Sequence, residues 1–248
     1  MKIAIIGYGK MGREVERLAK ARGIEVTSII DPSEKTAFHL INPESLKNAD
    51  VAIDFTQPDS ALDNIKAVAA AKKNLVMATT GWHDKMDEAK SIVKKSGTGM
   101  IYSSNFSIGV NAYFRIVEEA AKVFNRLEEY DAYAYELHHN QKKDSPSGTA
   151  KTIAQILTGN ISRKKKALYD RLDRQIEAPE LHVASIRAGS IPGTHVVGFD
   201  SEADTIEIKH TARNRSGFAA GALMAAEWIQ GRKGFFTMAD FMQDYFRK

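Results

Sequence analysis

The sequence predicts an α/β protein with a Rossmann-type, doubly wound parallel sheet and a second α+β domain that carries a mixed or antiparallel sheet. Three observations support this prediction. Short apolar runs alternate with helical patterns over the first hundred residues, a glycine-rich turn follows the first run, and the alternation stops after Asn105. Strands that alternate with helices are typical of a parallel sheet covered on both faces. Consecutive strands indicate antiparallel pairing instead.

The first element is a strand over residues 2–6, which ends directly at the motif GYGKMG. A helical pattern then continues to Arg22, where Gly23 ends it, and a second strand over 24–30 stops at Asp31. In such a turn the first glycine permits the bend, the second lets a pyrophosphate approach, and the third lets the helix pack on the strand. The acid can accept hydrogen bonds from a ribose. This context favours a dinucleotide site over a glycine turn without a ligand.

Further strands are expected over 51–55, 75–77 and 100–102, and helices over 59–71 and 83–95. Ligands of doubly wound sheets bind beyond the carboxyl ends of the strands. The loops that leave these three strands are small or polar, at residues 55–58, 78–81 and 103–106. We expect them to line the cofactor site, although each loop alone also fits an ordinary turn.

After residue 105 the pattern changes. A long helix is expected over 110–124, with Ile116, Val117, Ala120 and Phe124 on one shared face. The following elements are expected to be a strand over 129–137, a helix over 149–157, strands over 182–187, 195–199 and 205–210, and a helix over 218–230. The last helices are expected to return to the first domain. The consecutive strands predict the mixed or antiparallel sheet.

Composition excludes several classes of protein. Of the 248 residues, 43% are hydrophobic and 27% are charged, which is typical of a globular chain with a real core. The absence of cysteine excludes disulfides, thiolate nucleophiles and zinc fingers. No apolar run reaches the roughly 18 residues that cross a bilayer, and the first residues do not resemble a signal peptide. We therefore expect a cytoplasmic protein with no membrane partner.

The formal net charge of +4 permits nucleic-acid binding but does not indicate it. The densest basic run, residues 163–166, has no interleaved aromatic side chains for base stacking and matches no common nucleic-acid module. A solvated surface loop is the favoured interpretation of this run, and no nucleic-acid partner is expected.

The stretch ELHHNQKKDSPSGTA, Glu136 to Ala150, collects side chains that are costly to bury. Ser147 is a good helix cap, and Gly148 and Thr149 would then present unpaired backbone N–H groups. A carboxylate binds to such a helix start for the same reason that a phosphate does. The stretch therefore predicts a site for a small anion.

His138, His139 and Lys142 precede this helix start, and histidine titrates near neutral pH. An imidazole beside a bound anion is a candidate proton-transfer group. Asp144 is expected to orient Lys142 or to hold the loop. Two alternatives remain: a surface loop of satisfied polar side chains, and a metal site. The metal site is disfavoured because further ligands are not evident and the lysines would repel a cation.

The stretch satisfies the pattern E-x-H-H-x-x-K-x-D-x-P-S-G-T-A at every fixed position. Through it the chain resembles the 4-hydroxy-tetrahydrodipicolinate reductase (dihydrodipicolinate reductase) family, and the resemblance covers essentially the whole chain. Other matching stretches are GYGKMG at the start, ATTG at 78–81, SSNFSIGV at 103–110, RAGSIPGTHVVGF at 187–199 and HTARNRSGFAAGA at 210–222. Ala78 stands where the family commonly has glycine, and Ser145 replaces a common alanine; both are small.

The resemblance implies hydride transfer from NADH or NADPH to a cyclic dicarboxylate, giving tetrahydrodipicolinate in lysine and diaminopimelate biosynthesis. By motif position, His138 is the expected proton donor or acceptor and Lys142 the expected proton donor. The expected substrate-binding residues are His139, Gly148 and Thr149. The expected cofactor-binding residues are Gly7, Tyr8, Gly9, Lys10, Met11, Gly12, Asp31, Ala78, Thr79, Thr80, Ser103, Ser104, Asn105 and Phe106.

The resemblance also implies two domains and a homotetramer assembled through the sheets of the second one. Residues 1–108 and 217–248 are the expected dinucleotide-binding domain, and residues 109–216 the expected substrate-binding and oligomerisation domain. Two other functions stay open. A non-catalytic nucleotide sensor would explain the glycine turn but not the histidines and lysine. The other is a different oxidoreductase on a related scaffold, such as an amino-acid or aldehyde dehydrogenase, although the absence of cysteine excludes aldehyde-type enzymes that acylate a thiol.

The family often places an arginine directly after the ribose-binding acid, where it can pair with a 2′-phosphate. Here Pro32 follows Asp31, and Lys35 is the nearest cation in sequence. A carboxylate that faces a phosphate is unfavourable, so the sequence predicts a preference for NADH over NADPH.

Overall fold

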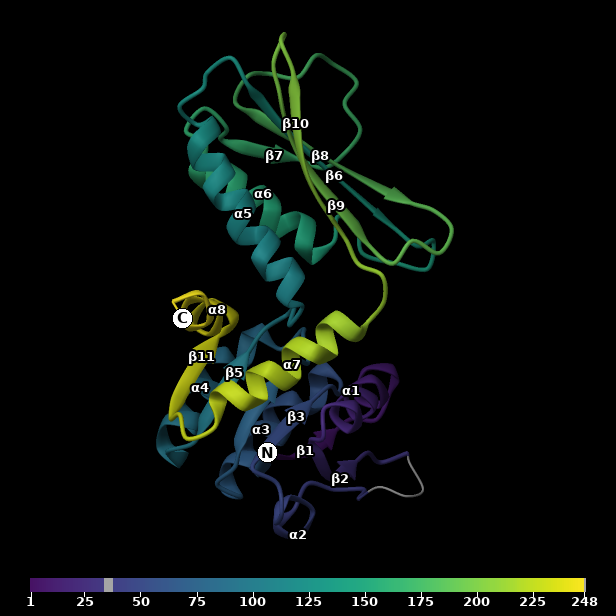
Figure 1. Ribbon diagram of the computed structural model, residues 1–248, viewed down its shortest axis with the longest axis vertical. Coiled ribbons are helices and arrows are strands. Elements are labelled where there is room, and N and C mark those ends of the chain that lie inside the picture. Colours follow the sequence, from purple (N-terminus) through teal and green to yellow (C-terminus); the bar gives the residue numbers. More distant parts are fainter. Residues whose placement is uncertain (34–37, 248) are drawn as a thin grey trace. The chain divides into compact units, whose positions relative to one another are not determined.

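The computed structural model of the protein describes residues 1–33 and 38–247 (Figure 1). The chain divides into two compact units. Unit 1 consists of Met1–Asn111 and Arg215–Lys248, and unit 2 of Ala112–Asn214. Unit 1 contains a parallel sheet and unit 2 a separate mixed sheet, which confirms the predicted fold class.

The sheet of unit 1 has six strands in the order β11-β5-β4-β3-β1-β2, and all neighbouring strands are parallel. The strands are β1 Lys2–Ile6, β2 Glu25–Ile30, β3 Val51–Asp54, β4 Asn74–Met77, β5 Gly99–Tyr102 and β11 Gly234–Thr237. From β1 the chain places β2 on one side and β3 on the other. The carboxyl ends of β1 and β3 therefore lie where the strand order reverses, which is where ligands of such sheets bind.

Helices cover both faces of this sheet. They are α1 Lys10–Ala21, α2 Pro43–Leu46, α3 Pro58–Ala70, α4 Met86–Ser96, α7 Ser216–Ile229 and α8 Met238–Phe246, with a 3-10 turn at His83–Lys85. Helices α1 and α7 pack together on one face, and α3 and α4 pack together on the other (Figure 1). Central residues such as Ile5 and Ile53 are fully buried, as the continuous apolar runs predict.

The C-terminal return of the chain is only partly as expected. Helix α7 packs on β3, β4 and β5, as predicted for the last helices. Strand β11 was not predicted. Its four residues GFFT carry too short a pattern to separate a strand from a loop, and only pairing with β5 defines it.

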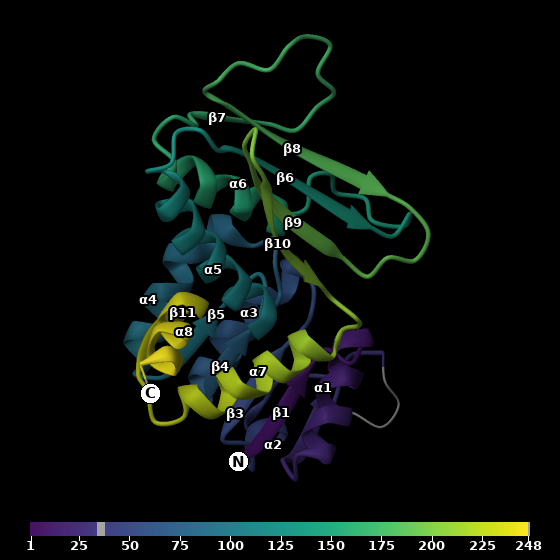
Figure 2. The same ribbon diagram turned by 45° about the horizontal axis from the view of Figure 1, so that its top comes forward.

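The sheet of unit 2 has five strands in the order β10-β9-β6-β8-β7. The strands are β6 Asp131–His138, β7 Lys166–Leu168, β8 Glu180–Arg187, β9 Thr194–Asp200 and β10 Thr205–Thr211. Strand β8 runs parallel to β6 and β7, whereas β9 is antiparallel to β6 and β10. Helices α5 Ile108–Phe124 and α6 Gly148–Asn160 lie on one face of this sheet (Figure 2).

The buried face of α5 differs from the predicted one. The buried residues are Val110, Tyr113, Val117, Ala121 and Phe124, whereas Ile116 is 54% exposed. The prediction was wrong for Ile116 because the buried stripe is centred near Val117. At 3.6 residues per turn, Ile116 lies about 100° away from that residue.

The prediction of a solvated basic loop at residues 163–166 was wrong for its first half. Lys164 is 1% exposed, and its Nζ contacts Asp131 Oδ1 at 2.6 Å and donates to the carbonyl of Glu180 at 2.7 Å. Arg163 donates to backbone carbonyls beyond the end of α5, including that of Phe124 at 3.0 Å. These cations satisfy carbonyl groups that the helix end and the neighbouring loop leave unpaired.

Candidate functional site

The glycine turn after β1 has the shape that the motif predicts. Gly7 has a φ of +85°, and a Cβ there would lie 2.5 Å from the carbonyl oxygen of Phe55. A Cβ on Gly12 would lie 2.1 Å from the carbonyl oxygen of Gly7. At Gly9, by contrast, a Cβ would meet no other part of the described chain within 4 Å. Two glycines are thus required by close packing, and the third leaves space for a ligand.

The start of α1 is open to an anion. Its N-cap is Gly9, which offers no side-chain cap, and its first turn contains no acidic residue. The N–H groups of a helix start and its positive partial charge attract phosphate groups. Of the neighbouring residues, Lys10 is exposed and Met11 is half-buried. The residues at this turn therefore fit a pyrophosphate.

Asp31 lies directly after β2 and faces the same turn. Its Oδ2 accepts a hydrogen bond from the Tyr8 N–H at 2.7 Å, and its Oδ1 accepts one from the Ser33 N–H at 2.9 Å. Burial raises the pKa of Asp31, but a bond from the Ser33 hydroxyl at 2.6 Å, the two backbone bonds and the charge of Arg13 lower it overall. The carboxylate is therefore ionised and sits beside the glycine turn, as predicted. The other cation considered above, Lys35, lies outside the described residues.

The loops after β3 and β4 are tied together by Asp54, which is fully buried. Its Oδ1 accepts bonds from the Thr56 N–H at 2.9 Å and from Thr79 Oγ1 at 2.8 Å, and its Oδ2 accepts one from Asn64 Nδ2 at 2.8 Å. The hydroxyl of Thr79 is therefore engaged in a buried hydrogen bond, whereas Thr80 is exposed. Sequence reasoning missed Asp54, although an acid that ends an apolar strand was the available signal.

The loop after β5 is also built by internal bonds. Ser103 Oγ donates to the carbonyl of Asn105 at 2.8 Å, and Asn105 Oδ1 accepts from the Ser107 N–H at 2.9 Å. Ser104 is exposed. Phe106 is 2% exposed, and a Cβ on Gly221 of α7 would lie 1.7 Å from its carbonyl oxygen. Phe106 therefore anchors the loop against α7.

In unit 2, Glu136 and His138 are the last inward-facing residues of β6. Alternation along a strand places both side chains on the face that α5 and α6 cover. The register pairs Glu136 with His195 on β9 and with Ser185 on β8, and pairs His138 with Arg187. The sheet thus brings five polar residues from three strands together on one buried face.

Glu136 is the centre of this cluster. Its Oε1 accepts bonds from the Ser147 N–H at 2.9 Å, Ser185 Oγ at 2.9 Å and Arg187 Nη2 at 2.8 Å. Its Oε2 accepts from Ser147 Oγ and lies 3.3 Å from His195 Nε2. Burial raises the pKa of Glu136, but His195, Ser147 and Arg187 together hold it well below its usual range. The carboxyl group is ionised although it is fully buried.

His138 is 8% exposed. Its Nδ1 lies 3.4 Å from Glu136 Oε2, and its ring centroid lies 5.1 Å from that of His195. Burial lowers the pKa of His138 to about 4, against the opposing effect of Glu136; the charges of Lys142 and Arg187 add to the lowering. The imidazole is therefore neutral near pH 7, with one nitrogen that donates and one that accepts.

The loop between β6 and α6 holds the other predicted residues. Lys142 Nζ donates to Asp144 Oδ1 at 2.6 Å, so Asp144 is in contact with the lysine. The Lys142 N–H donates to the carbonyl of His139 at 3.1 Å, so the loop is a closed turn. Arg187 Nη2 also donates to the carbonyl of Asp144 at 2.6 Å. The turn is thus tied to strand β8.

Helix α6 begins as predicted. Ser147 is its N-cap, and the hydroxyl accepts a bond from the Ala150 N–H at 3.1 Å. Gly148 is exposed, Thr149 is half-buried, and the first turn has no acidic residue. The open helix start therefore lies next to the cluster of Glu136 and can receive a carboxylate.

Sequence reasoning missed three members of the cluster: Ser185, Arg187 and His195. Arg187 and His195 lie in the quoted stretch RAGSIPGTHVVGF, but nothing local shows that they face Glu136. Among the described residues, the one group of three side chains close enough together to ligate a metal ion is Glu136, His138 and His195. The bond from Arg187 to that carboxylate disfavours a cation there, and the expected absence of a metal stays a prediction.

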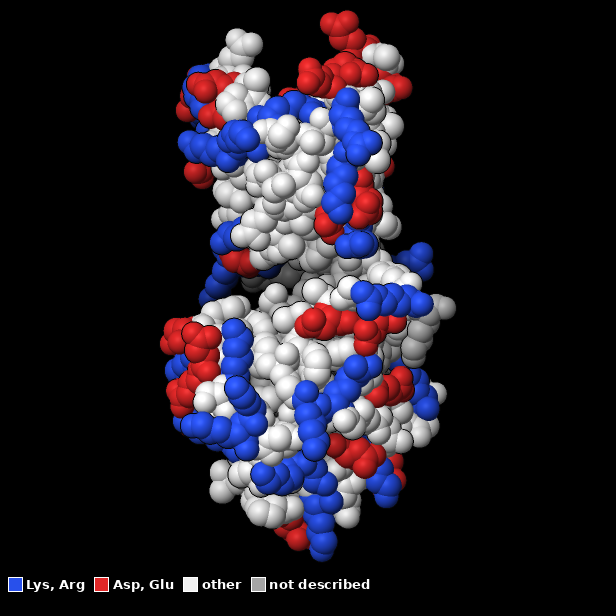
Figure 3. Space-filling view, turned by 90° about the vertical axis from the view of Figure 1, so that its left-hand side faces the viewer, with Lys and Arg blue, Asp and Glu red and all other residues white. Residues whose placement is uncertain are grey.

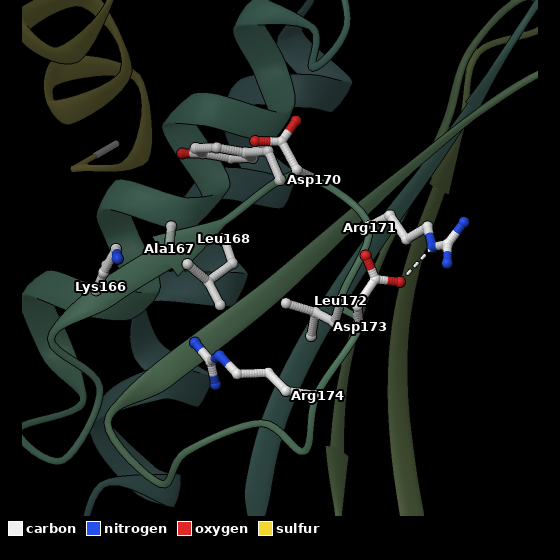
Figure 4. A pocket seen from close by; sticks show the side chains of 9 residues that line it. Lys166, Ala167, Leu168, Asp170, Arg171, Leu172, Asp173 and Arg174 are labelled. Atoms are coloured by element: carbon white, nitrogen blue, oxygen red, sulfur yellow. Dashed lines mark hydrogen bonds and ion pairs between the residues drawn. The ribbon is translucent and has the colours of Figure 1, made fainter.

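Other surface features do not belong to this cluster. A hollow of about 610 Å³ is lined by the continuous stretch Lys166–Arg174, where Arg171 Nε donates to Asp173 Oδ1 at 2.5 Å (Figure 4). None of its lining residues comes from the stretch 136–150. On the face drawn in Figure 3, basic and acidic side chains are interspersed. Within residues 1–33 and 38–247, no helix has the length and apolar character of a membrane span.

Comparison with known proteins is consistent along the whole chain. Residues 1–106 match the family model described as "Dihydrodipicolinate reductase, N-terminus", and residues 109–242 match the one described as "Dihydrodipicolinate reductase, C-terminus". A 4-hydroxy-tetrahydrodipicolinate reductase of Christiangramia forsetii is 40% identical, with 100% of both chains covered. One from Methanoregula boonei is 36% identical, with 97% of both chains covered.

A solved structure shares the fold. The dipicolinate-bound dihydrodipicolinate reductase from Paenisporosarcina sp. TG-14 superposes with a TM-score of 0.77 at 22% identity, covering 96% of this chain and 97% of the other. The two family models together with the full-length relatives establish what the sequence motifs indicated: this chain belongs to the dihydrodipicolinate reductase family.

Proposed function

We propose that the protein reduces 4-hydroxy-tetrahydrodipicolinate to tetrahydrodipicolinate with a reduced nicotinamide cofactor, as a step of lysine and diaminopimelate biosynthesis. Full-length membership of the family supports this function. The structural observation that carries it is the cluster in unit 2, where a buried neutral imidazole, a lysine and an open helix start come together.

The overall reaction replaces a ring hydroxyl with hydrogen. It therefore takes up one hydride and one proton and releases water. The nicotinamide supplies the hydride. The protein has to bind the two carboxylates of the substrate and to provide the proton, and the residues of unit 2 offer groups for both tasks.

We assign the proton transfer to His138, as donor or acceptor, and to Lys142, as donor. Both lie at the end of β6 or in the turn that follows it, and Lys142 is close enough for its charge to lower the pKa of His138. His139 and the N–H groups of Gly148 and Thr149 would bind a carboxylate of the substrate. Backbone N–H groups at a helix start and a side-chain N–H donor are suitable partners of such a group.

The cofactor would bind at unit 1. The space at Gly9 and the uncapped start of α1 fit the pyrophosphate, and Asp31 fits the adenosine ribose. The loops at 78–80 and 103–106 follow the neighbouring parallel strands β4 and β5, and they would line the nicotinamide half of the cofactor. Residues 1–108 and 217–248 would then form the dinucleotide-binding domain, and residues 109–216 the substrate-binding domain.

A preference for NADH belongs to the same proposal. Asp31 is ionised and accepts two backbone bonds at the position where a 2′-phosphate would enter. A second negative charge there is unfavourable.

A homotetramer built through the sheets of unit 2 also belongs to the proposal. The face of this sheet opposite α5 and α6 carries the stacked rings of Tyr133 and Tyr135, with centroids 6.5 Å apart, and Ile186, which is 48% exposed. A second copy of the chain would cover these groups. The cytoplasmic location expected from the sequence stays a prediction.

One assay tests the function. Purified protein is mixed with NADH or NADPH and with the condensation product of pyruvate and aspartate semialdehyde, and the absorbance of the reduced cofactor is followed. We expect it to fall only when the condensation product is present. A constant absorbance with both cofactors would refute the proposed activity.

A further inference from the structure

The carboxylate of Glu136 has no role in the function proposed so far, although it is the most enclosed ionised group beside His138. Its side chain is 0% exposed, and that of His138 is 10% exposed. Burying a charge in this way is costly unless the charge is paired and fully hydrogen-bonded. Glu136 meets that condition on Oε1, which accepts three bonds. Oε2 accepts from Ser147 Oγ and lies 3.3 Å from His195 Nε2 and 3.4 Å from His138 Nδ1.

The geometry points to Glu136 as a positioning residue that holds the Nδ1–H of His138 through Oε2, so that Nε2 is the nitrogen that exchanges a proton with the substrate. This inference rests on the proposed function and deepens it. A carboxylate at one imidazole nitrogen fixes the tautomer and the ring orientation, and leaves the other nitrogen for the reaction.

Three observations support this orientation of the ring. His138 Nδ1 is a buried atom that has no hydrogen-bond partner among the described residues, and Glu136 Oε2 lies 3.4 Å from it. Such a separation is too long for a formed bond, but catalytic hydrogen bonds often shorten only when the substrate is bound. Nε2 points the other way, under the β8–β9 loop, where a Cβ on Gly193 would lie 3.1 Å from it. A side chain at Gly193 would press on that nitrogen.

The same carboxylate positions the anion-binding helix start. Both the N–H and the Oγ of Ser147 donate to Glu136, while Ser147 Oγ caps α6 by accepting from the Ala150 N–H. Ser147 directly precedes Gly148 and Thr149. Glu136 therefore links the imidazole to the amide groups that would bind the substrate carboxylate, and fixes one relative to the other.

The electrostatic effect of Glu136 on His138 has a definite sign. The titratable and charged groups near the ring are Glu136 on β6, Arg187 on β8, His195 on β9 and Lys142 in the turn, where Asp144 pairs with the lysine. Among the groups that act on His138, Glu136 raises its pKa, whereas His195, Lys142 and Arg187 lower it. Removing the carboxylate must therefore move the ionisation of His138 to lower pH.

The test compares Glu136→Gln with a matched control, Glu180→Gln. Glu180 is also an enclosed carboxylate of this sheet, with a side chain 7% exposed and bonded to Arg174 at 2.6 Å, but no imidazole in the described part of the chain forms an ion pair or hydrogen bond with it. Wild type and both variants are assayed for kcat, for the KM of each substrate, and for kcat/KM against pH.

We expect Glu136→Gln to lower kcat on the order of 10²-fold, the lower end for general acid–base groups, and to raise the KM of the dicarboxylate but not that of the cofactor. The ionisation of His138 in the pH profile should move to lower pH. Glu180→Gln should keep the wild-type values of kcat and KM and the wild-type profile. A Glu136→Gln enzyme with kcat within about twofold of wild type, well below the usual effect of such groups, and an unshifted profile would overturn the inference.

A second measurement needs no folded variant of Glu136. Sedimented wild-type protein with ¹⁵N-labelled histidines is studied by solid-state NMR near neutral pH, and the His138 signals are identified by their loss in His138→Gln. We expect a proton on Nδ1 and none on Nε2. The opposite tautomer would overturn the inference. An unchanged Glu136→Gln enzyme or the opposite tautomer would overturn the inference while the wild-type protein still turns over the substrate. Failure of the proposed function would instead be seen as no turnover by the wild-type protein.

Discussion

Thr79 Oγ1 donates to Asp54 Oδ1 over 2.8 Å, and this buried bond joins the loop after β4 to the end of β3. We predict that Thr79→Val weakens cofactor binding, because the loop at 78–80 loses its anchor at the edge of the sheet. The hydroxyl also accepts from the Thr56 N–H at 2.7 Å, and a buried polar group left without its partner costs about 1–3 kcal/mol. Unfolding should therefore become easier by a similar amount.

The measurement is the dissociation constant of NADH together with the urea midpoint. Thr27→Val is the matched control, since Thr27 Oγ1 donates to the carbonyl of Ile3 in the same sheet but away from the loops. If the two variants changed cofactor affinity equally, the bond between Thr79 and Asp54 would not be what positions the loop at 78–80.

Changes at the two proposed proton-transfer residues should affect turnover and leave cofactor binding almost unchanged. We predict that His138→Gln and Lys142→Ala each reduce kcat by about 10²–10⁴-fold, the range for general acid–base groups. Steady-state kinetics and fluorescence titration with NADH measure the two effects. Lys143→Ala, at an exposed neighbouring lysine, should keep near-normal turnover. If His138→Gln and Lys142→Ala did the same, the assigned roles would be wrong.

The sequence predicted most of unit 1 because buried parallel strands are continuous apolar runs, and the runs at 51–55 and 75–77 are short but well bounded. It failed for β7 and β11, whose three and four residues show no period. These strands exist only through pairing with β8 and β5.

In the candidate site, the local chemistry of the signature pointed to His138, Lys142 and the start of α6. It could not identify Ser185, Arg187 and His195 as partners of Glu136. Which residues face each other across strands depends on register, and a slip of one residue turns every side chain to the other face. The register between strands that are distant in sequence is a property of the folded sheet, so no single stretch of the sequence predicts it.

Cofactor choice should follow the charge at Asp31. We predict a higher kcat/KM with NADH than with NADPH, because the ionised carboxylate at the glycine turn would face the 2′-phosphate. Asp31→Ser should narrow the difference, chiefly by improving the KM of NADPH. Initial rates with both cofactors decide this. Tighter use of NADPH by the wild-type protein would refute the electrostatic argument.

Acid should destabilise the protein through His138. Its pKa is lowered from 6.5 to about 4 on folding, so the unfolded chain binds more protons between these values. The associated stability is present above pH 6.5 and is lost as the pH falls towards 4. Glu136 acts in the same direction at lower pH, because its pKa is also lowered by folding.

We predict that the free energy of unfolding in urea falls over this pH window, and that His138→Gln makes the fall shallower. Circular dichroism is the suitable signal, since both tryptophans, Trp82 and Trp228, lie in unit 1. His39→Gln, at an exposed histidine, is the control. An unchanged slope in His138→Gln would show that this imidazole is not the titrating group.

The face of the unit 2 sheet opposite α5 and α6 should control the assembly of copies of the chain into a tetramer. Tyr133 lies across Gly198 on the neighbouring strand, where a Cβ would be 2.1 Å from Cζ of the ring. With Ile186 exposed on the same face, a charge there should disrupt contact between copies, because a buried unpaired charge is costly. We predict that Ile186→Asp converts a tetramer to smaller species in sedimentation velocity, while Ile116→Asp on α5 does not. The two isoleucines are 48% and 54% exposed, so a loss of assembly in both variants, or in neither, would place the interface elsewhere.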